Sequence, residues 1–450
     1  AALSRMLGFA SGAARLRVSP ARRLAPVPAR RALGLKAASQ PPSGEAQRLI
    51  ALEERHGAHN YHPLPVVLER GKGVHVWDVE GKRYLDFLSA YSAVNQGHAH
   101  PKILAALSDQ AAKLTLTSRA FHNSVLGEYE RFITSFFGYE RVLPMNTGVE
   151  GGETAIKLAR RWGYDVKGIP EDQATVLFCE NNFWGRTIAA CSSSSDPTCR
   201  KGFGPFTPGM GLVPYNDLPA LEAALQADPH VAAFMLEPIQ GEAGVVVPDE
   251  GYLAGVRALC TRYNVLMIAD EVQTGLGRTG AMLAVDHEQV RPDVLVLGKA
   301  LSGGVYPVSA VLASDEVMLT VSPGEHGSTY GGNPLGSAVA IAALEVLRDE
   351  GLAENARVMG ERLRSGLEAL RGEAVVAVRG RGLLNAIVVR PPAPDGPGAL
   401  ELCHALMHAG LLAKPTHGDT IRLAPPLVLD AAQVEEAVDI LSREVRKMFG

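Results

Sequence analysis

Residues 265–271, Val-Leu-Met-Ile-Ala-Asp-Glu, and residues 294–299, Val-Leu-Val-Leu-Gly-Lys, are two short apolar runs that end in ionisable side chains. Runs of this length, rich in Val, Leu and Ile and closed by polar residues or Gly, are typical of strands buried on both faces. In one parallel sheet both strands would end at the same edge, where open α/β sheets bind ligands. The pattern therefore predicts that Asp270 and Lys299 lie near each other at the carboxyl edge of a parallel sheet.

The chemistry of this pair suits pyridoxal phosphate. A lysine can bind the aldehyde of this cofactor as a Schiff base, and an aspartate can keep its pyridine nitrogen protonated, which makes the ring an electron sink. The same two residues are also compatible with a structural ion pair or with two solvated strand ends, and on their own they favour that second interpretation. The surrounding sequence has to decide between the two.

Residues 268–280, Ile-Ala-Asp-Glu-Val-Gln-Thr-Gly-Leu-Gly-Arg-Thr-Gly, and residues 292–304, Pro-Asp-Val-Leu-Val-Leu-Gly-Lys-Ala-Leu-Ser-Gly-Gly, surround the pair. They resemble the signature of the class III aminotransferases. The resemblance runs from about residue 45 to the C-terminus. Further motifs similar to this family, and in particular to its ornithine-using members, lie at residues 60–65, 117–121, 182–186, 237–244, 327–334 and 412–419.

The order of predicted elements indicates an α/β protein. Strand-like runs at 175–179, 231–236, 265–269 and 294–298 alternate with helical stretches such as 218–226 and 251–262, which is typical of a mostly parallel sheet covered by helices. A hairpin is predicted over residues 73–87 around Glu80-Gly81. The resemblance implies more, namely the aspartate-aminotransferase-like fold type I, with a mostly parallel mixed sheet and a smaller α+β C-terminal domain. We therefore predict an N-terminal segment over 45–91, a large cofactor-binding domain over 92–339 and a small domain over 340–450.

Composition describes an ordinary globular protein. The chain has 450 residues, 46% of them hydrophobic and 20% charged, and its net charge is −4. This balance offers no basic field for nucleic acid, and no apolar run reaches the roughly 20 residues that span a membrane. The five cysteines lack paired metal-ligand spacing, so free thiols in a reducing compartment and no metal site are expected.

Residues 1–44 differ from the rest of the chain. They carry eight basic residues, and the first acidic residue is Glu45. An Arg-rich, acid-poor and Ser-containing composition is typical of a mitochondrial transit peptide. The prediction is import into the mitochondrial matrix; a disordered basic tail is the alternative.

The resemblance assigns residues to the cofactor. Residues 146–155, Asn-Thr-Gly-Val-Glu-Gly-Gly-Glu-Thr-Ala, lead into a helical pattern, as a phosphate site at a helix N-terminus requires. Besides the Schiff-base Lys299 and Asp270, the implied cofactor ligands are Gly148, Val149, Phe183, Gln273, Ser328 and Thr329. Phe183 is expected to stack on the ring, Gln273 to lie near its 3-hydroxyl oxygen, and Thr329 to reach the phosphate from a partner subunit. Gly152 departs from the alanine expected in this family.

The resemblance also implies a reaction: transfer of the δ-amino group of L-ornithine to 2-oxoglutarate. This gives glutamate and glutamate 5-semialdehyde, which cyclises to pyrroline-5-carboxylate. The implied substrate residues are Tyr61, Tyr91, Arg186, Glu242 and Arg422. Arg186 would bind the α-carboxylate of ornithine and Tyr61 its α-amino group. Glu242 would neutralise Arg422 until a dicarboxylate arrives for Arg422 to bind through two hydrogen bonds.

Three alternatives compete with this reading. A related aminotransferase would act on acetylornithine or 4-aminobutyrate, but the α-amino contact of Tyr61 favours unmodified ornithine. A nucleotide-binding oxidoreductase would need Gly-x-Gly-x-x-Gly after its first strand, and none is placed there. A protein without activity is disfavoured because every expected catalytic residue is present. We expect a homodimer or larger homo-oligomer, with active sites at the subunit interface, and no nucleic-acid or membrane partner.

Overall fold

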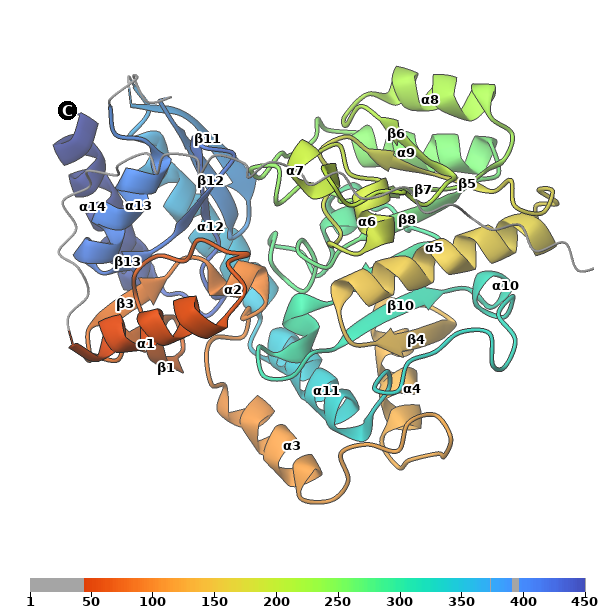
Figure 1. Ribbon diagram of the computed structural model, residues 1–450, viewed down its shortest axis with the longest axis horizontal. Helices are drawn as coiled ribbons and strands as arrows, with labels where there is room; N and C mark the ends of the chain where they lie inside the picture. Colours follow the sequence, from red (N-terminus) through yellow and green to blue (C-terminus); the bar gives the residue numbers. More distant parts are fainter. Residues whose placement is uncertain (1–43, 373, 391–395, 450) are drawn as a thin grey trace, which may run out of the picture. The chain divides into compact units, whose positions relative to one another are not determined.

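The computed structural model describes residues 44–372, 374–390 and 396–449 (Figure 1). The predicted transit peptide lies outside these residues, except for Gly44, where helix α1 (Gly44–His56) begins. Within the described parts of the chain, no helix is long and apolar enough to cross a membrane. All five cysteines are free and buried: Cys179, Cys191, Cys199, Cys260 and Cys403.

The centre of the fold is a seven-stranded mixed sheet, whose strands follow the order β4-β10-β9-β8-β7-β5-β6. The strands are β4 (Arg141–Met145), β5 (Thr175–Cys179), β6 (Met210–Val213), β7 (Val231–Leu236), β8 (Leu266–Asp270), β9 (Val294–Leu297) and β10 (Ser309–Ala313). From β9 to β6 all neighbours are parallel, whereas β10 is antiparallel to both β9 and β4. Strands β7 to β10 are buried along their whole length, as their continuous apolar sequences predict.

Helices cover both faces of this sheet. Val294 and Val296 of β9 pack in one buried cluster with Leu158 and Trp162 of α5 (Gly148–Asp165). Leu295 and Leu297, which alternate with them, belong to a different and larger cluster. Other helices in this part are α3 (Pro101–Ala111), α4 (Leu126–Phe137), α6 (Ile188–Ser192), α7 (Pro197–Arg200), α8 (Leu218–Ala227), α9 (Tyr252–Arg262), α10 (Asp315–Met318) and α11 (Pro334–Asp349). Two short 3-10 turns are η1 (Ala284–Glu288) and η2 (Lys299–Ser302).

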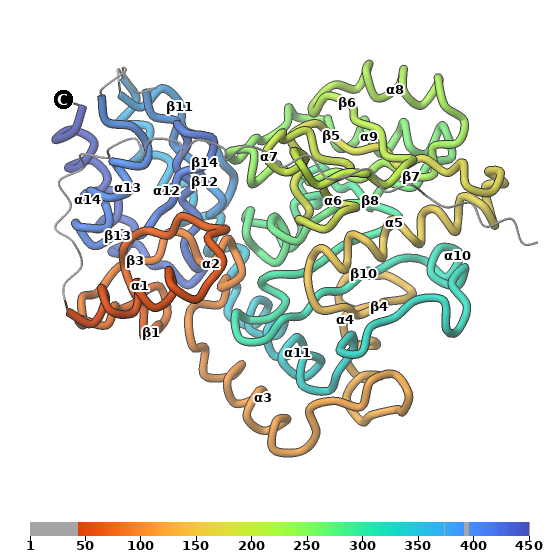
Figure 2. Tube along the Cα trace, viewed as in Figure 1, coloured from red at the N-terminus to blue at the C-terminus, as the bar shows by residue number. Residues whose placement is uncertain are grey.

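Two four-stranded sheets complete the fold. One has the order β1-β2-β3-β13, with β1 (Leu68–Lys72), β2 (His75–Asp78), β3 (Arg83–Asp86) and β13 (Leu411–Leu412). The other has the order β11-β12-β15-β14, with β11 (Val375–Arg381), β12 (Leu384–Val389), β14 (Lys414–Thr416) and β15 (Thr420–Leu423). Helices α12 (Leu352–Glu368), α13 (Ala399–Ala409) and α14 (Ala431–Phe449) belong with them (Figure 2).

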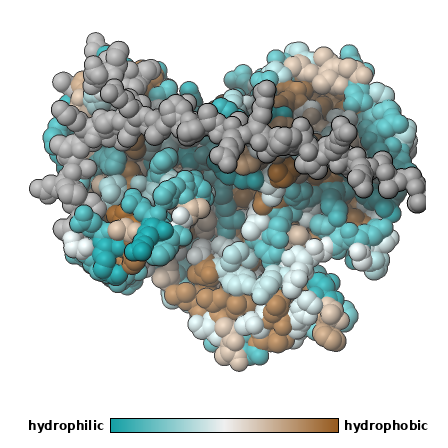
Figure 3. Space-filling view, viewed as in Figure 1, coloured by the Kyte–Doolittle hydropathy of each residue, from teal (hydrophilic) through white to brown (hydrophobic). Residues whose placement is uncertain are grey.

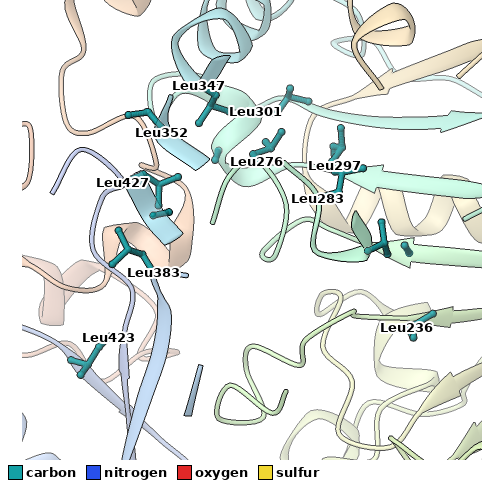
Figure 4. Close-up of a cluster of buried hydrophobic side chains, with 14 of the residues drawn as sticks. Leu236, Leu276, Leu283, Leu297, Leu301, Leu347, Leu352, Leu383, Leu423 and Leu427 are labelled. Carbon is teal, nitrogen blue, oxygen red and sulfur yellow. The ribbon is translucent and has the colours of Figure 1, made fainter. Parts of the chain in front are cut away.

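The N-terminal hairpin is joined to C-terminal sequence. Strand β13 pairs in parallel with β3, so that Leu411 lies opposite Leu85. The largest buried cluster also spans the central sheet and the C-terminal strands. Figure 4 shows leucines of this cluster from β7, β9 and β15, namely Leu236, Leu297 and Leu423, and from connecting segments, namely Leu283, Leu383 and Leu427.

The predicted α/β fold with a mostly parallel, helix-covered sheet and a smaller C-terminal part is confirmed. The hairpin around Gly81 is confirmed as well, because β2 and β3 pair antiparallel across it. The proposed domain boundaries at 91/92 and 339/340 stay a prediction.

Candidate active site

Asp270 and Lys299 lie at one edge of the central sheet. Asp270 is the last residue of β8, and Lys299 follows the neighbouring strand β9 as the first residue of η2. Both line a cavity of about 170 Å³. The residues around the cavity are Gly148, Val149, Phe183, Trp184, Gly185, Glu237, Glu242, Asp270, Val272, Gln273 and Lys299. The structure thus brings together seven of the residues predicted from the sequence.

The N-terminus of α5 forms one wall of this cavity. Gly148 is the first residue of the helix, and Thr147 caps it by accepting a hydrogen bond from the Glu150 main-chain N–H at 3.3 Å. Free N–H groups at such a helix start bind phosphate well. Ser328 lies near this loop, since its hydroxyl accepts a hydrogen bond of 2.9 Å from the Asn146 amide. Neither Ser328 nor the exposed Thr329 lines the cavity.

Phe183 and Gln273 offer an aromatic face and a free polar group. The Phe183 main-chain N–H donates to Glu237 Oε1 at 3.0 Å, which fixes the loop that carries the ring. Gln273 Oε1 is buried and has no hydrogen-bond partner in the described part of the protein. A Cβ on Gly241 would lie 1.4 Å from this oxygen, so only glycine allows the approach. An amine, a buried carboxylate, an aromatic ring, a helix N-terminus and an unpaired amide oxygen together fit pyridoxal phosphate.

Burial is the main cause of the pKa shifts of the ionisable groups that line the cavity. It raises the pKa of Asp270 to about 6, although a hydrogen bond from Val272 N and the charge of Lys299 both lower it. Burial, and then the charge of Asp270, raise the pKa of Glu237 to about 8. Burial lowers the pKa of Lys299, against the opposing charges of Asp270 and Glu237. Burial thus disfavours the charged form of all three groups, and we expect Glu237, which also faces the charge of Asp270, to be neutral at pH 7.

Glu242 links the cavity to a buried arginine. Arg422 of β15 donates to Glu242 through two hydrogen bonds, of 2.7 and 3.4 Å. Arg422 also lies over the ring of Tyr91, with its guanidinium carbon 4.9 Å from the ring centroid. A planar guanidinium with an ionic partner on one side and an aromatic ring on another is a preorganised carboxylate site.

Tyr91 is presented by a left-handed turn. Residues Ser89, Ala90, Tyr91 and Ser92, which form α2, have φ angles of 49°, 48°, 60° and 70°. Asp86 holds the start of the turn, because its carboxylate accepts hydrogen bonds from Leu88 N at 2.9 Å and Ser89 N at 2.8 Å. Left-handed backbone at several consecutive residues is costly and persists only where the surroundings impose it.

The predicted substrate residues surround Tyr91. Burial raises the pKa of Tyr91, the charges of Arg422 and Arg186 lower it, and Glu242 and Tyr61 raise it, so all four lie within its electrostatic reach. Arg186 is exposed and lies over the Phe183 ring, with its guanidinium carbon 5.5 Å from the centroid. Tyr61 is 66% exposed.

Glu237 is the main site residue that the sequence reasoning did not assign. Glu237 directly follows β7, as Asp270 ends β8. Polar residues at the carboxyl ends of parallel strands face the ligand site of an α/β sheet, and this rule, which identified Asp270, also identifies Glu237. Within the described ranges, no group of three or more His, Cys, Asp or Glu side chains is arranged to hold a metal ion.

Comparison with known proteins identifies a family and several proteins that this chain resembles. The model of the family "Aminotransferase class-III" matches residues 56–445. A protein of Rattus norvegicus named ornithine aminotransferase, mitochondrial, is 65% identical over 405 residues, which cover 90% of this chain and 91% of that protein. The crystal structure of an ornithine aminotransferase from Toxoplasma gondii ME49 superposes with a TM-score of 0.88 at 49% identity, covering 90% of this chain and 96% of that chain. An acetylornithine aminotransferase from Elizabethkingia anophelis superposes with a TM-score of 0.82 at 55% identity, covering 90% of this chain and all of that one, 100%.

Proposed function

This chain belongs to the class III aminotransferase family, and we propose that it transfers the δ-amino group of L-ornithine to 2-oxoglutarate. The products are glutamate and glutamate 5-semialdehyde, which cyclises to pyrroline-5-carboxylate. The fold is that of pyridoxal-phosphate enzymes of fold type I. The observation that carries the proposal is the buried Arg422, paired with Glu242 beside a second cation, Arg186.

When bound, pyridoxal phosphate supplies a reactive carbonyl and an electron-withdrawing ring. In the proposed roles, Asp270 would hold the pyridine nitrogen protonated, and Lys299 would bind the cofactor covalently between turnovers. Lys299 Nζ would be the base that takes the proton from the substrate carbon and holds it for return. Gly148 and Val149 would hold the phosphate together with Thr329 delivered from a partner subunit and the adjacent Ser328. Phe183 would stack on the ring, and Gln273 would lie near its hydroxyl.

The enzyme has to recognise two substrates of different charge in one pocket. Arg186 binds the α-carboxylate of ornithine, and Tyr61 contacts its α-amino group. Tyr91 lies against Arg422 and within electrostatic reach of Arg186. Glu242 neutralises Arg422 while ornithine is bound. When 2-oxoglutarate enters, Glu242 moves away and Arg422 binds the α-carboxylate bidentately. This arrangement is supported by the 33% exposure of Glu242, against 5% for Arg422, since the glutamate is the partner with room to leave.

The purified protein tests this function directly. L-ornithine should bleach the visible absorption of the bound cofactor, and adding 2-oxoglutarate should restore it. Trapping the cyclised product with 2-aminobenzaldehyde would identify it. Absence of product with ornithine at saturating concentration would refute the proposal.

Acetylornithine is the second candidate amino donor, because the acetylornithine aminotransferase of Elizabethkingia anophelis is 55% identical to this chain. The same assay with N-acetylornithine and with 4-aminobutyrate separates the candidates. Ornithine should give the highest kcat/KM, since acetylation removes the positive charge of the α-amino group. A higher kcat/KM for acetylornithine would reassign the substrate.

The proposed assembly is a homodimer with shared active sites. Thr329 is exposed and away from its own cavity, as a residue that serves a partner would be. Figure 3 shows apolar residues gathered around α3, and several large exposed apolar side chains lie there and near Thr329: Leu104, Leu114, Phe121 and Tyr330. Sedimentation should give a dimer or a larger oligomer. A holoenzyme crystal structure in which every phosphate ligand came from a single chain would contradict this assembly.

The proposed location is the mitochondrial matrix. It rests on the basic composition of residues 1–44 and on the mitochondrial name of the rat relative. A reporter fused to these residues should enter mitochondria, and a diffuse cytosolic reporter would refute the location.

A further inference from the structure

Strand β14 holds the main chain of two loops of the proposed substrate site. It is the edge strand of its sheet, and Lys414 lies directly opposite Arg422 of β15. The ammonium of Lys414 donates a hydrogen bond to the carbonyl of His62. The hydroxyl of Thr416 donates to the carbonyl of Glu242 at 3.0 Å. In both loops the hydrogen bond from β14 holds a main-chain carbonyl, that of Glu242 itself in one loop and that of His62, the residue after Tyr61, in the other.

Lys414 is the anchor of the segment that carries Tyr61. Residues 57–63 are all exposed. Among the hydrogen bonds of the described residues, those at Gly57 and His59 run back into α1, and only that of Lys414 ties the segment to a distant element. A segment with little burial and few hydrogen bonds opens easily, so the position of Tyr61 depends on this contact.

The environment of Lys414 suits an anchoring role. Its side chain is partly buried, and burial lowers its pKa, with a smaller opposing effect from Cys403 on α13. A cation partly removed from water needs a hydrogen-bond acceptor, and the His62 carbonyl supplies one. The bond therefore ties the residue next to Tyr61 to the strand that pairs with the Arg422 strand.

We propose that Lys414 is a positioning residue that holds Tyr61 at the mouth of the site and thereby sets recognition of the substrate α-amino group. This inference rests on the proposed function, in which Tyr61 contacts that amino group. It assigns Lys414 no contact with substrate or cofactor. Lys414 acts on the position of residues 57–63, and it affects the choice of substrate only through Tyr61.

The first test measures the segment without measuring activity. Chymotrypsin should cut the holoenzyme slowly after the exposed Tyr61. Lys414→Met should speed this cleavage about fivefold or more, because the loss of one charge-assisted hydrogen bond shifts an opening equilibrium by about that factor. Lys414→Arg should restore resistance. Thr416→Val is the matched control from the same strand, and it should leave this cleavage unchanged.

The second test separates substrates that differ only in the α-amino group. Lys414→Met should lower kcat/KM for L-ornithine about five- to tenfold. It should leave kcat/KM for 5-aminopentanoate, which is ornithine without that group, nearly unchanged. Tyr61→Phe should show the same selectivity. The double variant should lose no more than Tyr61→Phe alone, because both changes act on one interaction.

The outcomes distinguish this inference from the proposed function. An unchanged rate of chymotrypsin cleavage in Lys414→Met would overturn the inference. It would also be overturned if Lys414→Met were cleaved faster but lost kcat/KM equally for ornithine and 5-aminopentanoate, while Tyr61→Phe lost it only for ornithine. If Tyr61→Phe itself does not discriminate between the two substrates, the proposed role of Tyr61 fails. The cleavage rates then decide whether Lys414 anchors the segment.

Discussion

Arg422 and Glu242 form a two-hydrogen-bond ion pair of 2.7 and 3.4 Å in which the arginine is buried and the glutamate is not. The main-chain carbonyl of Glu242 accepts hydrogen bonds from Thr416 and His417, so the backbone of the glutamate is held in place. We therefore expect that rotation of the Glu242 side chain alone can expose Arg422. In the proposed function the pair acts as a gate, which would open without a movement of the fold.

Removal of the Glu242 charge should leave that gate open. Glu242→Ala should lower kcat/KM of the ornithine half-reaction about tenfold, because a free Arg422 competes with Arg186 for the carboxylate of ornithine. The half-reaction with glutamate should become faster, since a dicarboxylate no longer has to break the ion pair. Stopped-flow absorbance with each amino acid measures both rates.

The ion pair of the exposed Arg262 with the partly exposed Glu222 provides the control, because it joins α8 and α9 and neither residue lines the cavity. Glu222→Ala should change neither half-reaction. Equal losses for ornithine and glutamate in Glu242→Ala would show that this glutamate is only structural.

Asp270→Asn should preserve the fold and remove most of the activity. The amide cannot hold the pyridine nitrogen protonated, so the ring becomes a poorer electron sink. Loss of an ionic contact made in the transition state should lower kcat at least about 10³-fold, or about 4 kcal/mol. Single-turnover kinetics with ornithine measures this loss. A decrease of only a few-fold would mean that another group stabilises the ring nitrogen.

Lys299→Ala should bind pyridoxal phosphate without a covalent bond and should not turn over. The remaining ligands of the cavity, such as Gly148 and Phe183, are untouched by this change. Equilibrium dialysis would measure cofactor retention, and the absorption spectrum would report the missing covalent linkage. Normal turnover in this variant would reject Lys299 as the catalytic base.

The position of the sheet edge could be predicted from the sequence because each strand is marked by its own short apolar run. The buried runs at β8 and β9 are continuous and apolar, so their ends, and with them Asp270 and Lys299, could be located to within a residue. The direction of β10 could not be predicted, since its sequence is equally apolar in either direction. The left-handed turn of Tyr91 was also out of reach, because Ser and Ala prefer right-handed backbone and only tertiary contacts such as those of Asp86 impose the other hand.

This turn leads to a prediction about stability. Ala90 is exposed and has φ 48° and ψ 46°, a conformation that costs an L-residue about 1 kcal/mol or more. Ala90→Gly should remove that cost, and the larger entropy of the unfolded glycine chain should offset only about 0.4–1 kcal/mol of the gain. The variant should therefore be about 0.5 kcal/mol more stable, or unchanged, in chemical denaturation.

Exposed Ala223 in the right-handed helix α8 is the control for this change. Ala223→Gly should destabilise the protein by about 1 kcal/mol. Similar destabilisation by the two substitutions would contradict a left-handed turn at Ala90.

Glu237 should make stability depend on pH. Its folded-state pKa of about 8 lies above its ordinary value of 4.5, chiefly because of burial. Glu237 therefore contributes its full stabilisation below pH 4.5, where it is neutral in both the folded and the unfolded chain. This stability is lost progressively as pH rises from 4.5 through the folded pKa of about 8. Glu237→Gln cannot ionise, so its stability relative to the parent protein should rise between these limits by up to several kcal/mol and then level off. Thermal unfolding of both proteins from pH 5 to pH 9 measures the difference, with exposed Glu53→Gln as the control. A difference that stays constant over this range would mean that Glu237 is ionised throughout, and its proposed neutral state beside Asp270 would be wrong.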